Sequence, residues 1–153
     1  MALRNIVIKG DEVLNKRCKE VKKVDSRIIE LLDDMKETMS EKNGVGLAAP
    51  QVGILKRVVV IDVGDGLIEL INPVIISSEG EQCEAEGCLS VPGVYATVKR
   101  PAKVVVEHLN RGGETVRTEG EELKAICLCH ELDHLDGILF DEKAIEYIEV
   151  EKE

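Results

Sequence analysis

The sequence predicts an α+β fold, because one long amphipathic helix precedes a series of short strands joined by tight turns. In the early helix, apolar residues recur every three or four positions from Asp25 to Ser40. Asp25 or Ser26 can cap its first turn, and Asn43-Gly44 ends it. We expect mostly antiparallel β-sheets packed around a second helix late in the chain.

Short strands account for the middle of the chain. Turn signals at Asp65-Gly66 and at Asn110–Gly113 predict two hairpins, and Pro73 predicts a break between neighbouring strands. Tight turns of this kind favour antiparallel pairing over parallel crossovers. The predicted strands are Arg57–Val63, Leu67–Ile71, Val74–Ser78, Val94–Lys99, Lys103–Leu109 and Glu114–Thr118.

The second helix begins near Gly120–Glu122 and carries apolar residues and two histidines on neighbouring faces. No linker rich in proline, glycine or serine divides the 153 residues. We therefore expect a single domain over residues 1–153.

Charge and composition exclude several function classes. The net charge of −10 argues against binding to nucleic acid or to anionic lipid, and aromatic residues make up only 2% of the chain. The sequence has neither a membrane-spanning apolar run nor a signal peptide, so we expect a cytoplasmic protein. Five cysteines, an odd number, argue against a disulfide framework.

The strongest chemical signal is the segment His130-Glu131-Leu132-Asp133-His134 in the late helix. Histidines at positions i and i+4 project from one helical face and can bind one metal ion. Glu131 follows the first histidine, where its carboxylate can reach a water molecule at the metal. This pattern predicts a hydrolytic metal site.

Two histidines leave a catalytic site one protein ligand short. A common metalloprotease motif places a third histidine downstream, but Phe140 occupies that position here. Another takes a glutamate from a second helix well beyond the motif, but the 19 residues after His134 leave little room for such a helix. The donor should therefore come from upstream. Cys88 is favoured, with Cys127 as the competitor because it shares a helix face with His130.

A third segment, Gly44–Gly53, contains two glycines that allow close approach of a backbone to a ligand. Gln51 offers a neutral amide donor in the same segment. The segment lacks the spacing and the lysine of a phosphate-binding P-loop.

Together, three segments of the sequence resemble the motifs of the peptide deformylases, in the family's order and over roughly the whole chain. The motifs G-x-G-L-A-A-x-Q, E-G-C-L-S and H-E-x-D-H-x-x-G stand here as Gly44–Gln51, Glu86–Ser90 and His130–Gly137. The resemblance implies an enzyme that removes the N-formyl group from the formyl-methionine of nascent polypeptides and releases formate.

The resemblance also implies roles for individual residues. Glu131 would be the general base and acid, and Gln51 with the backbone N–H of Leu89 would bind the formyl oxygen. The metal ligands would be Cys88, His130 and His134. The substrate-binding residues would be Gly44, Val45, Gly46, Gly87 and Leu89.

The implied cofactor is one divalent metal ion, with Fe²⁺ expected in the cell and Zn²⁺, Ni²⁺ or Co²⁺ possible in a purified sample. Near the site, Glu86 and Arg100 could pair, and Asp133 could anchor the helix. The expected partners are N-formyl-methionyl nascent peptides. We expect only weak, transient ribosome association, because the segment Glu142–Glu153 is acidic and contains no arginine.

Two other functions remain open on the residues alone. The same His130, Glu131 and His134 could serve a small zinc endopeptidase, although the absent downstream ligand counts against it. A structural metal-binding module would instead use Cys127 or Cys129 as closing ligands and would have no catalytic water.

Overall fold

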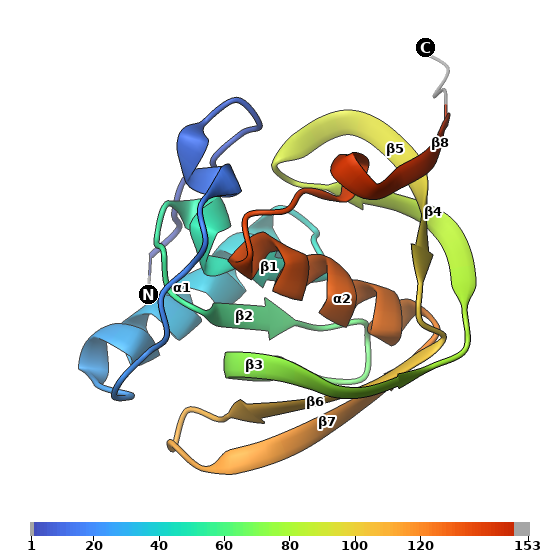
Figure 1. Ribbon diagram of the computed structural model, residues 1–153. Coiled ribbons are helices and arrows are strands. Elements are labelled where there is room, and N and C mark those ends of the chain that lie inside the picture. The colour runs from blue at the N-terminus through green and yellow to red at the C-terminus, as the bar shows by residue number, and fades with distance from the viewer. Residues whose placement is uncertain (1, 149–153) are drawn as a thin grey trace.

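The computed structural model describes residues 2–148 and contains two α-helices and eight strands within that range (Figure 1). The helices are α1 (Ser26–Glu41) and α2 (Leu123–Leu135). The strands are β1 (Gly46–Ala48), β2 (Val58–Ile61), β3 (Ile68–Glu79), β4 (Gln82–Cys88), β5 (Val91–Arg100), β6 (Lys103–Leu109), β7 (Thr115–Glu121) and β8 (Ala144–Ile148). Short 3₁₀ turns are η1 (Glu12–Asn15), η2 (Ala49–Val52) and η3 (Phe140–Lys143).

Helix α1 forms where the apolar periodicity predicts it. The Asp25 carboxylate caps its first turn by accepting hydrogen bonds from the N–H groups of Arg27 and Ile28, both at 3.1 Å. Its buried face, which includes Leu32 and Met35, packs with residues of β1 and β2 in one apolar cluster. The early helix is therefore confirmed, within one residue at each end.

The strands form two sheets, and within each sheet all neighbouring strands are antiparallel. One sheet has the order β1-β2-β3-β6-β7, and the other has the order β4-β5-β8. Helix α2 crosses the centre of the molecule with the larger sheet on one side and β4, β5 and β8 on the other (Figure 1). Its buried residues, such as Leu128 and Leu135, complete the core cluster beneath the larger sheet. The α+β architecture around the late helix is confirmed.

The break predicted at Pro73 was wrong. Strand β3 continues through this position, with a bulge between Ile71 and Val74 and a left-handed conformation at Asn72 (φ 52°). The Asn72 side chain accepts from the N–H of Val21 and donates to its carbonyl oxygen, both at 2.8 Å. A bulge tolerates proline because it interrupts the ladder of hydrogen bonds.

Three strands lie outside the sequence-based prediction, namely β1, β4 and β8. Gly120 also belongs to β7, so the late helix begins at Leu123 rather than earlier. No helix among the described residues is long and apolar enough to cross a membrane. The single domain over residues 1–153 stays a prediction, and the predicted acidic tail lies outside the described residues from position 149 onward.

Candidate metal centre

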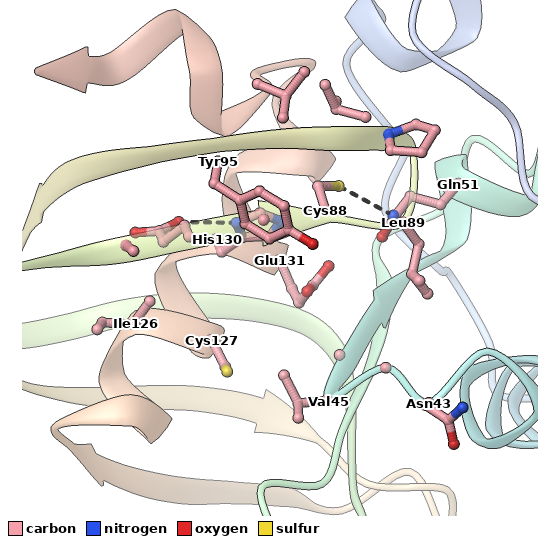
Figure 2. A pocket seen from close by; sticks show the side chains of 18 of the residues that line it. Asn43, Val45, Gln51, Cys88, Leu89, Tyr95, Ile126, Cys127, His130 and Glu131 are labelled. Atoms are coloured by element: carbon pink, nitrogen blue, oxygen red, sulfur yellow. Dashed lines mark hydrogen bonds and ion pairs between the residues drawn. The ribbon is translucent and has the colours of Figure 1, made fainter. Parts of the chain in front are cut away.

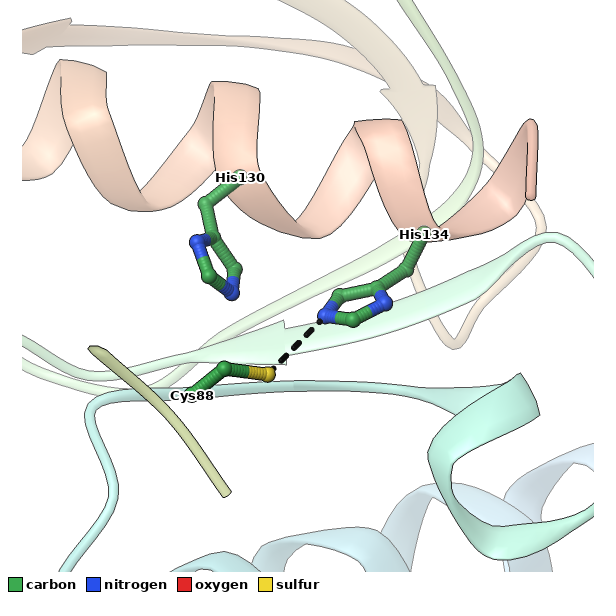
Figure 3. Close-up of side chains that lie close together, drawn as sticks. All are labelled: Cys88, His130 and His134. Atoms are coloured by element: carbon green, nitrogen blue, oxygen red, sulfur yellow. Dashed lines mark hydrogen bonds between the residues drawn. The ribbon is translucent and has the colours of Figure 1, made fainter. Parts of the chain in front are cut away.

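Helix α2 presents His130 and His134 from adjacent turns of one face, and both imidazoles point toward Cys88 (Figure 3). One ligand atom from each of the three residues lies within 4.8 Å of the others. The closest described contact joins Cys88 Sγ to His134 Nε2 at 3.4 Å. Cys88 thus meets two histidines that lie more than 40 residues later in the chain.

The end of β4 places the cysteine there. The ladder between β4 and β5 shifts register between Glu86 and Cys88, and Cys88 then pairs with Val91 across a tight turn. Cys127, the competitor, lies outside this three-residue cluster. Burial raises the pKa of Cys127 to about 12 and that of Cys129 to about 11, so both remain protonated thiols near neutral pH. The geometry therefore brings Cys88 to the histidines, as predicted.

The donor set fits a divalent transition metal. Thiolate and imidazole ligands suit zinc and iron, and three protein ligands leave a position open for water or substrate. Within the described residues, the buried Glu131 Oε1 has no hydrogen-bond partner, although buried polar atoms normally have one. A water molecule at the open position would supply that partner.

Glu131 lies deep beside the cluster, with Oε1 4.0 Å from His134 Nε2. Burial raises the pKa of the Glu131 carboxyl to about 7, against the attraction of His130. Gly46 passes so close that an added Cβ would lie 2.5 Å from Glu131 Oε2. The structure thus gives a reason for glycine at position 46 that the sequence did not reveal: it makes room for the carboxylate.

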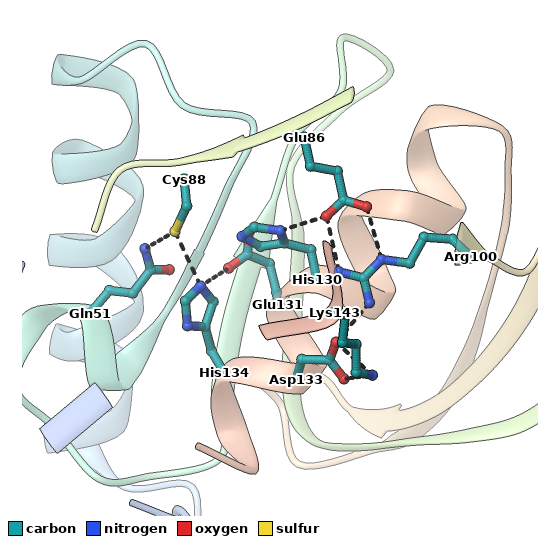
Figure 4. Close-up of polar contacts among 9 residues, drawn as sticks. All are labelled: Gln51, Glu86, Cys88, Arg100, His130, Glu131, Asp133, His134 and Lys143. Atoms are coloured by element: carbon teal, nitrogen blue, oxygen red, sulfur yellow. Dashed lines mark hydrogen bonds and ion pairs between the residues drawn. The ribbon is translucent and has the colours of Figure 1, made fainter. Parts of the chain in front are cut away.

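Gln51 is buried in η2, and its neighbours determine how its amide is oriented. Its Oε1 accepts a hydrogen bond from the Ala48 N–H at 2.9 Å. Its Nε2 therefore faces the site, 3.5 Å from Cys88 Sγ (Figure 4). The same Nε2 lies 3.2 Å from Ser90 Oγ. The side chain presents a donor beside the metal ligands.

A chain of charged side chains supports His130. Glu86 Oε1 lies 2.9 Å from His130 Nδ1, and Arg100 donates two hydrogen bonds of 2.9 Å to the same carboxylate. Asp133 accepts from Arg100 at 2.7 Å and from Lys143 at 3.2 Å (Figure 4). Burial opposes ionisation of Glu86, but hydrogen bonds from His130 and Arg100 outweigh it and lower its pKa. The predicted pairing of Glu86 with Arg100 is confirmed, and Asp133 anchors the helix through it.

A cavity of about 460 Å³ opens onto these groups (Figure 2). All the predicted catalytic, metal-binding and substrate-binding residues line it except His134, which contacts the lining residue Cys88. Sequence reasoning missed part of its wall, including Leu123 and Ile126. It also missed Phe140, whose ring stacks on His130 with centroids 5.7 Å apart. The helical period that identifies His130 also predicts Ile126, four residues earlier, on the same face.

Comparisons with known proteins agree with this geometry. The polypeptide deformylase family model matches residues 3–148. The chain is 66% identical to a peptide deformylase of Acetivibrio thermocellus over 97% of this chain and 88% of that protein. It is 55% identical to one of Thermoanaerobacter pseudethanolicus over 99% and 96% of the two chains.

Solved structures give the same result. A peptide deformylase from Legionella pneumophila superposes with a TM-score of 0.90 at 46% identity, covering 92% of this chain and 85% of that one. One from Thermotoga maritima superposes with a TM-score of 0.91 at 40% identity, covering 93% and 97%. The converging cysteine and histidines, the buried glutamate beside them and these matches over nearly the whole chain lead to one assignment: the chain belongs to the polypeptide deformylase family.

Proposed function

We propose that this chain hydrolyses the formamide bond of N-formyl-methionyl nascent peptides and releases formate. One observation carries the proposal: Cys88, His130 and His134 converge within 4.8 Å with the Glu131 carboxylate buried beside them. Membership of the deformylase family agrees with this reaction.

The proposed metal ligands are Cys88, His130 and His134. When bound there, a divalent metal ion supplies Lewis acidity and lowers the pKa of a water molecule at its open position. We propose Fe²⁺ as the metal in the cell, and the same ligands suit Zn²⁺, Ni²⁺ or Co²⁺ in a purified sample.

Glu131 is the proposed proton carrier. Its carboxylate is buried beside the metal ligands, 4.0 Å from His134 Nε2, where it can take a proton from the attacking water and later give it up. Oxygen from water bonds to the formyl carbon, and the C–N bond then breaks. Glu131 delivers the proton to the departing amine, which leaves as the new N-terminus.

Gln51 and the backbone N–H of Leu89 are the proposed donors to the formyl oxygen, on which negative charge develops. The orientation of the Gln51 amide, with Nε2 turned toward Cys88, supports this role. Removing one such donor typically costs about 3–4 kcal/mol of transition-state stabilisation.

Two strand edges border the cavity and suit a peptide substrate. Strand β1 is an edge of the larger sheet, and β4 is an edge of the smaller one. An extended peptide can add to such edges through backbone hydrogen bonds. We assign substrate contacts to Gly44, Val45 and Gly46 on one side and to Gly87 and Leu89 on the other, all of which line the cavity.

The test is formate release from formyl-Met-Ala-Ser by anaerobically purified, iron-loaded protein. Wild type should turn over rapidly, Glu131→Ala should keep its metal and lose activity, and Cys88→Ala should lose both. An unformylated, N-blocked peptide should remain intact. Metal-replete wild type that releases no formate would contradict the proposal, and cleavage of the blocked peptide would favour an endopeptidase.

The charge of the C-terminal segment bears on ribosome contact. We propose a cytoplasmic enzyme that meets nascent chains transiently, because the acidic segment from Glu142 should be repelled by ribosomal RNA. Co-sedimentation with ribosomes that persists at moderate salt would contradict this.

A further inference from the structure

The two proposed donors to the formyl oxygen come from different sheets. Gln51 lies in η2, directly after β1 of the five-stranded sheet, whereas Leu89 follows β4 of the three-stranded sheet. Both N–H groups serve one oxygen only if the two sheets keep a fixed spacing. No backbone hydrogen bond among residues 2–148 runs directly between Ala49–Gly53 and Cys88–Pro92.

The N-terminal segment joins these two pieces instead. The Val7 N–H donates to the carbonyl oxygen of Gln51, and the Lys9 N–H donates to that of Ser90, both at 2.7 Å. The two donors are two residues apart, whereas the Ile8 N–H between them has no hydrogen-bond acceptor within the described part of the chain. The segment therefore bridges the Gln51 motif and the Cys88 motif with alternate backbone groups.

Buried side chains connect the same two pieces to one another. Gln51 and Ser90 are each at most 1% exposed, and Gln51 Nε2 donates to Ser90 Oγ at 3.2 Å. A shift of either carbonyl oxygen would therefore be transmitted to a side chain that faces the site. Lys9 also pairs through its ammonium group with Asp141 in η3, next to the ring that stacks on His130.

We propose that the Val7 and Lys9 backbone N–H groups are positioning groups that hold Gln51 and Leu89 at the spacing the transition state needs. The inference rests on the proposed deformylase activity and refines it. Its expected signature is a fall in kcat with little change in KM or in metal content, since the strand edges and the metal ligands stay in place. A misplacement of about 1 Å can cost on the order of 10²-fold in rate.

Proline scanning of the segment tests the proposal, because proline removes one backbone N–H at a time. Val7→Pro and Lys9→Pro should each lower kcat by about 10- to 100-fold, and Ile8→Pro, the matched control, should stay near wild type. Lys9→Ala keeps the N–H and isolates the ion pair with Asp141. Equal losses of kcat in all three proline variants, or a change confined to KM or metal content, would overturn the proposal.

A second measurement needs no variant and keeps the test decisive if a proline variant does not fold. In wild-type protein, the amide hydrogens of Val7 and Lys9 should exchange with solvent more slowly than that of Ile8. Equal exchange at the three positions would overturn the proposal. Failure of the deformylase assignment would be recognised separately, because wild type itself would then release no formate.

Discussion

The two histidines of the metal centre lie one turn apart on α2, but different surroundings hold them. Nδ1 of His130 meets the Glu86 carboxylate at 2.9 Å, and Phe140 covers one face of its ring. Nδ1 of His134 is buried without a hydrogen-bond partner in the part of the chain that the structure describes. One ring is oriented by a charged hydrogen bond, and the other by packing and by contact with Cys88.

Their pKa values differ accordingly. Burial disfavours the charged form of His130, but Glu131, Cys88 and Glu86 outweigh it and raise its pKa to about 10. Burial, together with the positive charge of His130, lowers the pKa of His134 well below its usual value. Negative charge around His130 therefore favours the binding of a cation there. Substitutions that change charge should affect metal binding more when they are made near His130 than near His134.

Arg100→Leu should have the largest effect on stability. It removes the charged partner of Glu86, the carboxylate that contacts His130, and does not alter the contacts of His134. The variant leaves the Glu86 carboxylate buried without its bidentate partner, and breaking a buried pair in this way costs about 3–5 kcal/mol. Urea unfolding at pH 7.5 measures this loss. The comparison would fail if Arg100→Leu lost less than about 1 kcal/mol, the value expected of an exposed ion pair.

Glu86→Gln tests metal binding more directly. It removes the negative charge that faces His130 Nδ1, and loss of such a partner typically weakens metal affinity by about 10- to 100-fold. Competition with a chelator, using Zn²⁺-loaded protein, reports the affinity. Glu84→Gln, an exposed position on the same strand, is the control and should leave the affinity unchanged. Equal affinity in both variants would mean that the charge does not act on the site.

Phe140→Leu sharpens the comparison by removing the stacked ring while keeping an apolar side chain. The stacked pair and the small cavity that remains should together cost about 1–3 kcal/mol of stability. Because the ring restricts His130, the visible absorption spectrum of the Co²⁺-loaded protein should also change. Leu14→Ala, in the same core cluster, should lose stability without the spectral change. A spectrum of Phe140→Leu identical to wild type would show that the ring only fills space.

The sequence predicted the local part of this centre well. Helical spacing alone places His130, Glu131 and His134 together, because neighbours at i and i+4 share a face whatever the rest of the fold does. Helical spacing says nothing about Cys88, because the pairing of β4 with β5 is what brings this residue to the helix. The sequence around Phe140 did not indicate that its ring stacks on His130. It showed only that this position lacks the third histidine of a common metalloprotease motif.

Tertiary context also explains the errors in the fold. Strand β4 carries glutamates and a glycine, which have low strand propensity, and its pairing with β5 determines its conformation. Near Pro73 the hydrogen-bond ladder of β3 is disturbed, as the proline indicated, but the disturbance is a bulge and does not end the strand. The side chain of Asn72, bonded to Val21, holds a bulge within one continuous strand. Such long-range bonds have no periodic signal in the sequence.

The third histidine of the chain, His108, gives the smallest expected effect and the control for the other two. Its Nδ1 lies 2.9 Å from the Leu109 carbonyl oxygen and its Nε2 lies 2.8 Å from Thr118 Oγ1, away from the metal centre. Burial lowers its pKa, although the Leu109 carbonyl oxygen acts in the opposite direction. Below a pH of about 6.5, the usual histidine pKa, the unfolded chain therefore binds a proton that the folded chain resists. Stability should fall as the pH drops from 7.5 through that value, and His108→Gln should reduce this fall without changing metal affinity. Urea unfolding at pH 7.5 and 5.5 measures the difference. An unchanged pH dependence in the variant would assign the fall to His134, whose pKa burial also lowers, and metal loading of the protein would then suppress it.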